Sequence, residues 1–189
     1  MAQLMMYRPD APVPEYDLPA DYRVRNLKHG EEHLFCRACI GSFTEDENTE
    51  NYYRMMKTGV NIENVYVIEY TGSENLPDIA GTATAQYINT NPYLHYVAVR
   101  PEHRGKRLIY PVCAAVLRRH AELLGRGCFL TTDDQRVPAI ASYLHMGYLP
   151  VLWTEDAAER WDKVCALLDK TDVRYLTYAE CEADCHARK

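Results

Sequence analysis

Two segments, residues 97–109 and 128–148, constrain the fold of this chain more than any other part of it. The first reads VAVRPEHRGKRLI, an apolar strand that is stopped by a proline and followed by basic residues leading into a helix. The second reads CFLTTDDQRVPAIASYLHMGY, which predicts a short strand, a turn and a short helix that ends at Gly147. A basic turn before a helix directs backbone N–H groups and the positive end of the helix dipole toward an anion. We therefore expect this turn to bind a small anionic group.

Hydrophobic periodicity and turn residues predict further elements on both sides of these segments. The predicted strands are 22–27, 64–70, 79–87, 93–99, 128–132 and 148–153, and the predicted helices are 31–43, 48–57, 106–124, 138–146 and 155–169. A polar loop over 71–77 joins two of the strands, and Gly125 and Gly127 end the long helix. Residues 1–20 contain four prolines that block a helix, and we interpret them as an extended leader. Residues 21–170 then form one α/β domain, and 171–189 form a C-terminal tail with room for one last strand.

Composition indicates a soluble domain with a sizeable core, because 47% of the 189 residues are hydrophobic. The net charge of −6 gives no general field for nucleic acid, whereas the basic residues between 100 and 107 are concentrated locally. This combination fits a small anionic ligand better than a long polyanion. No apolar run reaches the length that crosses a membrane. Seven cysteines, several of them in apolar helical patterns, indicate free thiols in a reducing cytoplasm.

The order of elements and the motifs resemble the GNAT acyl-CoA N-acyltransferase superfamily over residues 22–153. The segment Tyr143-Leu144-His145-Met146-Gly147-Tyr148 matches the family pattern Y-x-x-x-G-[FY]. The phosphate turn of the family is R-x-x-G-x-G, and this chain has Arg104 at its start but Arg107 and Ile109 where the two glycines are expected. The family often has an asparagine near the start of the tyrosine helix, where this chain has Arg136.

The resemblance implies a GNAT fold, that is, a mixed central sheet with helices on both faces and a splayed strand pair that forms the cleft for coenzyme A. It implies acetyl-CoA as the cosubstrate and acetyl transfer to a primary amine of a small molecule or peptide. The strand 97–99 then pairs with the pantetheine arm, and Tyr143 protonates the departing thiolate. The residues implied in cofactor binding are Val97, Ala98, Val99, Arg104, Gly105, Lys106, Arg107, Leu108, Ile109 and Arg136.

The sequence does not identify the general base. Many family members use a glutamate at the position of Tyr93, where this chain has no carboxylate. His95 shares the face of Tyr93 and titrates near neutrality, Glu69 lies on an earlier strand, and a water chain is a third alternative. We take His95 as the candidate base. Loop 45–47, which is acidic, and the tyrosines at 52, 53, 66 and 70 are candidates for an acceptor site.

Three alternative interpretations accompany this one. In the first, the chain is a GNAT-fold protein that binds coenzyme A or has a regulatory role without catalysis, which the altered glycines and the missing glutamate favour. In the second, it is a plain interaction domain. Cys36, Cys39, Cys181, Cys185 and His186 have the chemistry of zinc ligands, but the first pair fits core packing and we expect no metal. Asp134 is interpreted as a helix cap. We expect neither a nucleic-acid nor a membrane partner, and the sequence is compatible with assembly of the protein as a homodimer.

Overall fold

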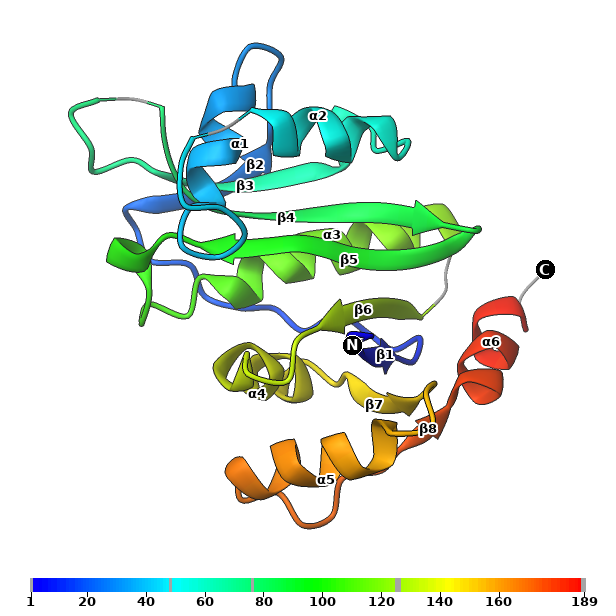
Figure 1. The fold of residues 1–189 in the computed structure, drawn as a ribbon. Helices are drawn as coiled ribbons and strands as arrows, with labels where there is room; N and C mark the ends of the chain where they lie inside the picture. Colours follow the sequence, from blue (N-terminus) through cyan, green and yellow to red (C-terminus); the bar gives the residue numbers. More distant parts are fainter. Residues whose placement is uncertain (1, 48, 76, 125–126, 188–189) are drawn as a thin grey trace. The chain divides into compact units, whose positions relative to one another are not determined.

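The computed structural model describes residues 2–47, 49–75, 77–124 and 127–187 (Figure 1). Contacts divide the chain into two compact units. The terminal unit contains Met1–Pro12, Asn91–Tyr93 and His120–Lys189, and the central unit contains Val13–Thr90 and Leu94–Arg119. Some sequence predictions fall on residues outside the described ranges. They are the helix position Asn48, the loop position Leu76, the helix stop Gly125, Met1 of the leader and 188–189 of the tail.

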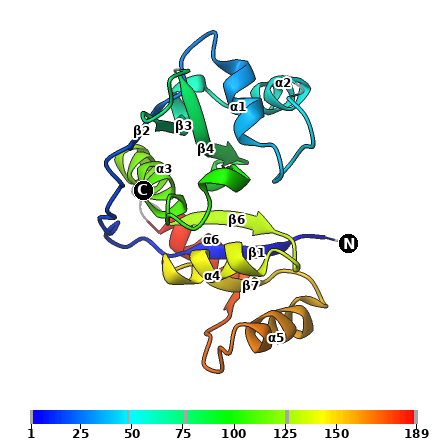
Figure 2. The ribbon, with the colours of Figure 1, turned by 90° about the vertical axis from the view of Figure 1, so that its left-hand side faces the viewer.

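The central unit contains a strand order of β2-β3-β4-β5. Its elements are β2 (Tyr22–Asn26), α1 (Glu32–Ala38), α2 (Glu50–Lys57), the 3-10 turn η1 (Ile62–Asn64), β3 (Val65–Tyr70), β4 (Asp78–Ile88), most of β5 (Asn91–Val99), η2 (Pro101–His103) and the first part of α3 (Ile109–Leu124). The pairs β2/β3 and β3/β4 are antiparallel. Asn89 and Thr90, both left-handed, form the tight connection from β4 to β5. Figures 1 and 2 show α1 and α2 on one face of these strands and α3 on the other.

The terminal unit continues from the first residues of β5 in the order β5-β6-β1-β7-β8. Its elements are β1 (Leu4–Arg8), β6 (Cys128–Thr132), α4 (Val137–His145), β7 (Leu149–Leu152), α5 (Ala157–Leu167), β8 (Leu176–Thr177) and α6 (Tyr178–His186). Strand β6 is parallel to β5 at Tyr93 and Phe129, and β7 is parallel to β8. In the described residues, eight strands in mixed orientation, with helices between them, confirm the predicted mixed α/β class.

Each unit has its own hydrophobic core. In the central unit, apolar residues of α1 and α2 pack on β3 and β4, with Phe35, Met55 and Val67 fully buried. In the terminal unit, Tyr7, Phe129 and Val151 pack against the buried cysteines of α6.

Several elements differ from the sequence prediction. Residues 4–8 were assigned to an extended leader, but they form the interior strand β1, which pairs antiparallel with β6 and β7. The first helix was expected to reach residue 43 and ends at Ala38, since Gly41 takes a left-handed conformation (φ 70°). The tail contains β8 and also a helix, α6, that the sequence prediction lacked. None of the helices in the described ranges is long and apolar enough to cross a membrane.

Candidate active site

The turn after β5 is held in place by the side chain of Arg104. Its Nε donates a hydrogen bond to the carbonyl oxygen of Val99 at 3.0 Å, and its Nη2 donates to the carbonyl oxygen of Gly41 at 3.0 Å. The guanidinium therefore ties the turn both to the end of β5 and to the segment after α1. In this arrangement Arg104 positions the turn, in addition to the positive charge that it adds there.

The turn itself contains two left-handed residues, Gly105 (φ 79°) and Arg107 (φ 59°), directly before α3 begins at Ile109. The predicted helix start at residue 106 is therefore three residues too early. The first turn of any helix presents N–H groups that have no partner within the helix, and the helix dipole makes this end positive. Leu108 is only 2% exposed and anchors the turn in the core. The turn has the backbone geometry and the charge that fit a phosphate group.

A hydrogen-bonded chain of three side chains lies next to this turn. Lys106 Nζ donates to the hydroxyl oxygen of Tyr22 at 2.8 Å, and that hydroxyl lies 2.9 Å from Nδ1 of His103. Burial and the nearby cations Arg100 and Lys106 lower the pKa of His103. The Lys106 ammonium can only donate, so the Tyr22 hydroxyl oxygen is its acceptor, and the same hydroxyl connects Lys106 to the His103 ring.

Strand β5 carries an irregular backbone at Tyr96, which is left-handed (φ 49°) although it lies inside a strand and has a side chain. Such a conformation in a β-strand is uncommon and changes the direction of the neighbouring backbone groups. The residues that follow are Val97, Ala98 and Val99, the segment predicted to pair with the pantetheine arm. At Ala98 the strand approaches β4 closely, because a Cβ placed on Gly81 would lie 2.6 Å from the carbonyl oxygen of Ala98.

His95 is fixed by a network that also determines its tautomer. Gln86 Nε2 donates to the hydroxyl of Thr58 at 2.8 Å, so Gln86 Oε1 is the acceptor for His95 Nδ1 at 2.5 Å. Thr58 in turn donates to the carbonyl oxygen of Met55 at 2.6 Å. Because Nδ1 carries the proton, Nε2 is the nitrogen with a lone pair. Burial lowers the pKa of His95, which keeps the ring neutral and able to accept a proton.

Tyr143 lies on α4 in the terminal unit and is 7% exposed. Its ring meets that of Tyr148 edge to face, with 6.0 Å between the ring centroids. The carbonyl oxygen of Tyr143 accepts backbone hydrogen bonds from Met146 and Tyr148, which close the turn at Gly147. Arg136, at the start of α4, pairs with Asp133 at 3.0 Å. The terminal unit thus holds both residues that the sequence assigned to this helix.

Two other carboxylates that the sequence singled out are held in ion pairs. Asp134 accepts two hydrogen bonds from Arg160 and makes no cap, so the helix-cap prediction was wrong; Arg136 occupies the cap position. Glu69 is 3% exposed and lies 2.5 Å from Arg23 and 2.8 Å from Arg25. Hydrogen bonds from these arginines lower its pKa, which makes it a structural anion and a poor base.

All seven cysteine side chains are buried. Cys181 and Cys185 lie on α6 within the core of the terminal unit, and burial raises the pKa of Cys181 to about 12. No group of three or more potential metal ligands comes together within the described ranges. Tyr93, at the position of the glutamate found in many family members, stacks on Phe129 with 5.4 Å between centroids.

Sequence reasoning missed three residues that shape this site. Tyr22 supports Lys106, Gln86 sets the His95 tautomer, and Tyr96 carries the backbone irregularity. Gln86 had a usable signal, since it is a long polar side chain in a strand made mostly of small and apolar residues. The conformation of Tyr96 has no signal in the residue type, because left-handed backbone favours glycine or asparagine.

Comparison with known proteins agrees with the fold. The sequence profile of the acetyltransferase (GNAT) family matches residues 31–148. The chain belongs to this family. No curated protein sequence matches the chain.

Solved structures share the fold at low sequence identity. A GCN5-related N-acetyltransferase from Sphaerobacter thermophilus superposes with a TM-score of 0.66 at 20% identity, covering 79% of this chain and 49% of that one. A GNAT-family acetyltransferase from Colwellia psychrerythraea gives 0.58 at 13% identity, covering 79% and 53%. The NatC complex bound to Gag peptide and CoA contains a chain that gives 0.56 at 13% identity, covering 67% and 83%. The chain spans about half the length of the first two of these structures.

Proposed function

We propose that the chain transfers an acetyl group from acetyl-CoA to a primary amine by direct attack in a ternary complex. The observation that carries the proposal is the turn before α3. Arg107 stands where the family has a glycine, yet its backbone takes the left-handed conformation that glycine adopts (φ 59°). The altered residue is therefore compatible with the backbone path of a phosphate turn, and it brings a further positive charge.

The proposed binding roles follow the fold. Backbone groups of Val97, Ala98 and Val99 pair with the amides of the pantetheine arm, as an added strand would. The phosphate-binding residues are Arg104, Gly105, Lys106, Arg107, Leu108, Ile109 and Arg136, of which the glycine and the two apolar residues contribute backbone only. The cationic side chains add charge-assisted contacts to the pyrophosphate.

The proposed chemistry uses two side chains. The ammonium form of the amine loses one proton to Nε2 of His95, and the neutral nitrogen attacks the thioester carbonyl. The C–S bond then breaks as the amide forms, and the nitrogen loses its second proton to solvent. Tyr143 donates a proton to the departing thiolate, so CoA leaves as the free thiol, and the phenolate regains a proton from solvent. The neutral state and fixed tautomer of His95 support its role, because a base must have its lone pair available at working pH.

The alternative is a GNAT-fold protein that binds CoA without catalysis. The observation that favours it is Tyr93, which is stacked in a core at the position where many family members have a glutamate base. Release of free thiol from acetyl-CoA in the presence of amines distinguishes the two proposals, because a binding protein retains CoA and releases none.

The test is thiol release from acetyl-CoA across a panel of primary amines, with wild type and Tyr143→Phe. This substitution keeps the ring and removes only the hydroxyl, so turnover should fall by about 10²- to 10⁴-fold, the usual contribution of a general acid. Tyr148→Phe is the matched control, since its ring packs against Tyr143 and the family pattern accepts phenylalanine there. Equal turnover of wild type and Tyr143→Phe would exclude Tyr143 from the chemical step, and no thiol release with any amine would favour the alternative.

A further inference from the structure

The ring of Tyr96 connects the candidate base to an exposed aromatic side chain. Its centroid lies 4.3 Å from that of His95, at an interplanar angle of 51°, and 5.9 Å from that of Phe43, at 72°. Aromatic rings attract one another in such tilted and edge-to-face arrangements. Phe43 is 42% exposed although it is a large apolar residue. The three rings therefore form one aromatic surface that extends from His95 to the exposed ring of Phe43.

The left-handed backbone of Tyr96 explains how this surface forms. Consecutive side chains of a regular strand point to opposite faces of the sheet, so the rings of His95 and Tyr96 would not meet there. The conformation of Tyr96 (φ 49°) breaks this alternation, and the two rings lie in contact. Such a conformation costs free energy and persists only where the surrounding structure holds it. Here the fully buried Phe35 meets the Tyr96 ring edge to face, with 5.9 Å between centroids.

Hydrogen bonds connect Phe43 to the turn before α3. The backbone N–H of Phe43 donates to the carbonyl oxygen of Cys39 at 2.9 Å, so this residue belongs to a hydrogen-bonded turn after α1. Two residues earlier, the carbonyl oxygen of Gly41 accepts the hydrogen bond from Arg104 Nη2 at 3.0 Å. The side chain of Arg104 thus joins the segment that carries Phe43 to the proposed phosphate turn. Direct contacts within the central unit therefore link Phe43 both to this turn and, through Tyr96, to His95.

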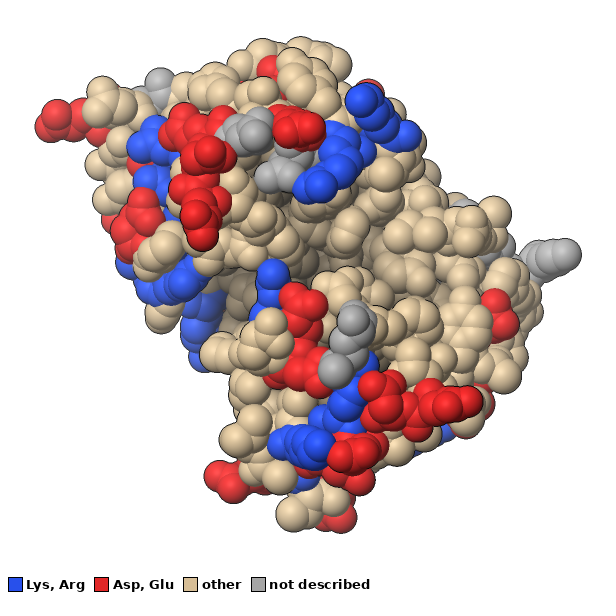
Figure 3. Space-filling model, in the orientation of Figure 1, with Lys and Arg blue, Asp and Glu red and all other residues tan. Residues whose placement is uncertain are grey.

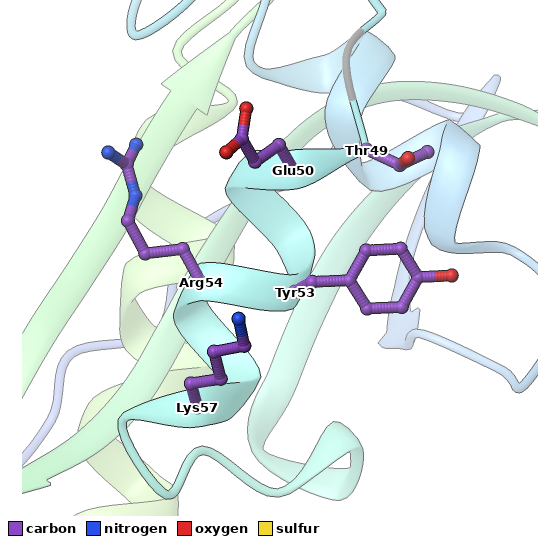
Figure 4. Close-up of a pocket in the computed structure, with 5 residues that line it drawn as sticks. All are labelled: Thr49, Glu50, Tyr53, Arg54 and Lys57. Atoms are coloured by element: carbon purple, nitrogen blue, oxygen red, sulfur yellow. The ribbon is translucent and has the colours of Figure 1, made fainter.

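Charge does not select a ligand class on the neighbouring surface of the central unit. Helix α2 lines an open hollow with charged side chains of both signs, which include Glu50, Arg54 and Lys57 (Figure 4). Figure 3 shows acidic and basic atoms side by side over α1 and α2. Only a cleft lined by one sign of charge concentrates ligands of the opposite sign. Discrimination between ligands is therefore expected from the aromatic surface.

We propose that Phe43 and Tyr96 bind an aromatic ring of the amine acceptor, and that Phe43 determines the specificity for this ring. A general base lies within about 3 Å of the group that it deprotonates, so a substituent of the amine begins beside His95 and next reaches Tyr96 and Phe43. The acceptor class is therefore a primary amine whose nitrogen is one or two carbons from an aromatic ring. The catalytic meaning of this inference rests on the proposed acetyl transfer, but binding of the ring is measurable without turnover.

The test uses primary amines that differ in the group at the end of the same short linker: 2-phenylethylamine, 2-cyclohexylethylamine and propylamine. NMR titrations measure their binding with and without saturating CoA. Wild type should bind the phenyl compound at least threefold more tightly than the cyclohexyl compound, about the effect expected from attraction between aromatic rings. It should bind the phenyl compound at least tenfold more tightly than propylamine, about the effect expected from the apolar area that the ring buries.

Two substitutions of Phe43 separate an aromatic contact from a merely apolar one. Phe43→Ala should remove the preference for phenyl over cyclohexyl and should lower the preference over propylamine. Phe43→Leu should lose only the first preference, because leucine keeps an apolar contact without a ring, and it also covers the case in which alanine disturbs the turn after α1. The matched control is Leu123→Ala, which truncates an apolar residue of similar exposure (45%) in the terminal unit and should retain both preferences.

The outcomes separate this inference from the proposed acetyl transfer. Equal binding of the phenyl and cyclohexyl amines to wild type, or an undiminished phenyl preference in both Phe43 variants, overturns the aromatic site even if amines are acetylated. A phenyl preference that disappears in Phe43→Leu supports the site even if no thiol is released, and the proposed acetyl transfer alone then fails. Where thiol is released, the ratio of kcat/KM values for these two amines should follow the binding ratio in wild type and fall to about one in Phe43→Leu.

Discussion

The backbone of Arg107 provides a sharp test of the phosphate turn. A left-handed conformation costs an ordinary L-residue about 1–2 kcal/mol, and glycine is free of this cost but loses about 0.5–1 kcal/mol through its greater freedom in the unfolded chain. The Arg107 guanidinium also lies 5.4 Å from the ring centroid of Tyr110, a contact that is lost equally in Arg107→Gly and Arg107→Ala. The difference in unfolding free energy between these two variants therefore isolates the effect of the backbone conformation at residue 107.

We expect Arg107→Gly to be about 1 kcal/mol more stable than Arg107→Ala, which corresponds to roughly 2–4 °C in Tm for a chain of this size. Lys106 provides the matched control, because it is not among the left-handed residues and only the entropic effect of glycine operates there. Lys106→Gly should be less stable than Lys106→Ala by about 0.4–1 kcal/mol. Urea denaturation of the four variants measures both differences. The left-handed conformation of Arg107 would be refuted if the glycine and alanine variants had the same order of stability at residues 106 and 107.

Two further predictions concern β4 and β5. Gly81→Ala should destabilise the fold by about 1–3 kcal/mol in urea denaturation, because the new methyl group would lie 2.6 Å from the Ala98 carbonyl oxygen and the strands would have to separate; wild-type stability in this variant would contradict the close approach. The value of kcat/KM should decrease only below pH 6.5, which is the ordinary pKa of histidine. Burial lowers the pKa of His95, so this base stays neutral at pH 6.5 and above. His95→Gln should remove this acid limb, and an unchanged limb would assign it to another group.

The sequence predicted the middle of the chain better than its ends. Strands 65–70, 78–88 and 91–99 and the helix before β6 have clear periodicity and clear turn residues, and their positions are confirmed to within a few residues. Strand β1 was missed because LMMY is a continuous apolar run without alternation, as expected of a strand buried on both faces, and it is followed directly by a proline-rich segment. Only its partners β6 and β7, more than a hundred residues away, define it.

Helix α6 had a signal that was available in the sequence. Thr177 and Glu180 form a capping box, in which the threonine hydroxyl accepts from the backbone N–H of Glu180 and the glutamate accepts from that of Thr177. The spacing T-x-x-E predicts such a start. The two missed elements also contact each other, because the Tyr7 hydroxyl of β1 donates to the carboxylate of Asp184 on α6 at 2.7 Å. Cys181 and Cys185 are buried on this helix as core residues.

The candidate site was predictable in residue type and only partly in geometry. The basic turn, the tyrosine helix and His95 were all visible in the sequence. The left-handed state of Arg107 and Tyr96 was not, because it results from tertiary constraints that override the preference of these residue types. The roles of the carboxylates were not visible either, since a glutamate in an alternating strand has the same pattern whether it acts as a base or, like Glu69, neutralises two arginines.

The proposed phosphate turn is tested most directly by calorimetric titration of CoA into the protein and into Arg104→Ala. We expect saturable binding to wild type, driven by the turn before α3. Binding to the variant should be weaker, because the turn loses the hydrogen bonds from Arg104 to the carbonyl oxygens of Val99 and Gly41 together with one positive charge. No detectable binding to wild type at millimolar CoA would show that the turn does not bind coenzyme A.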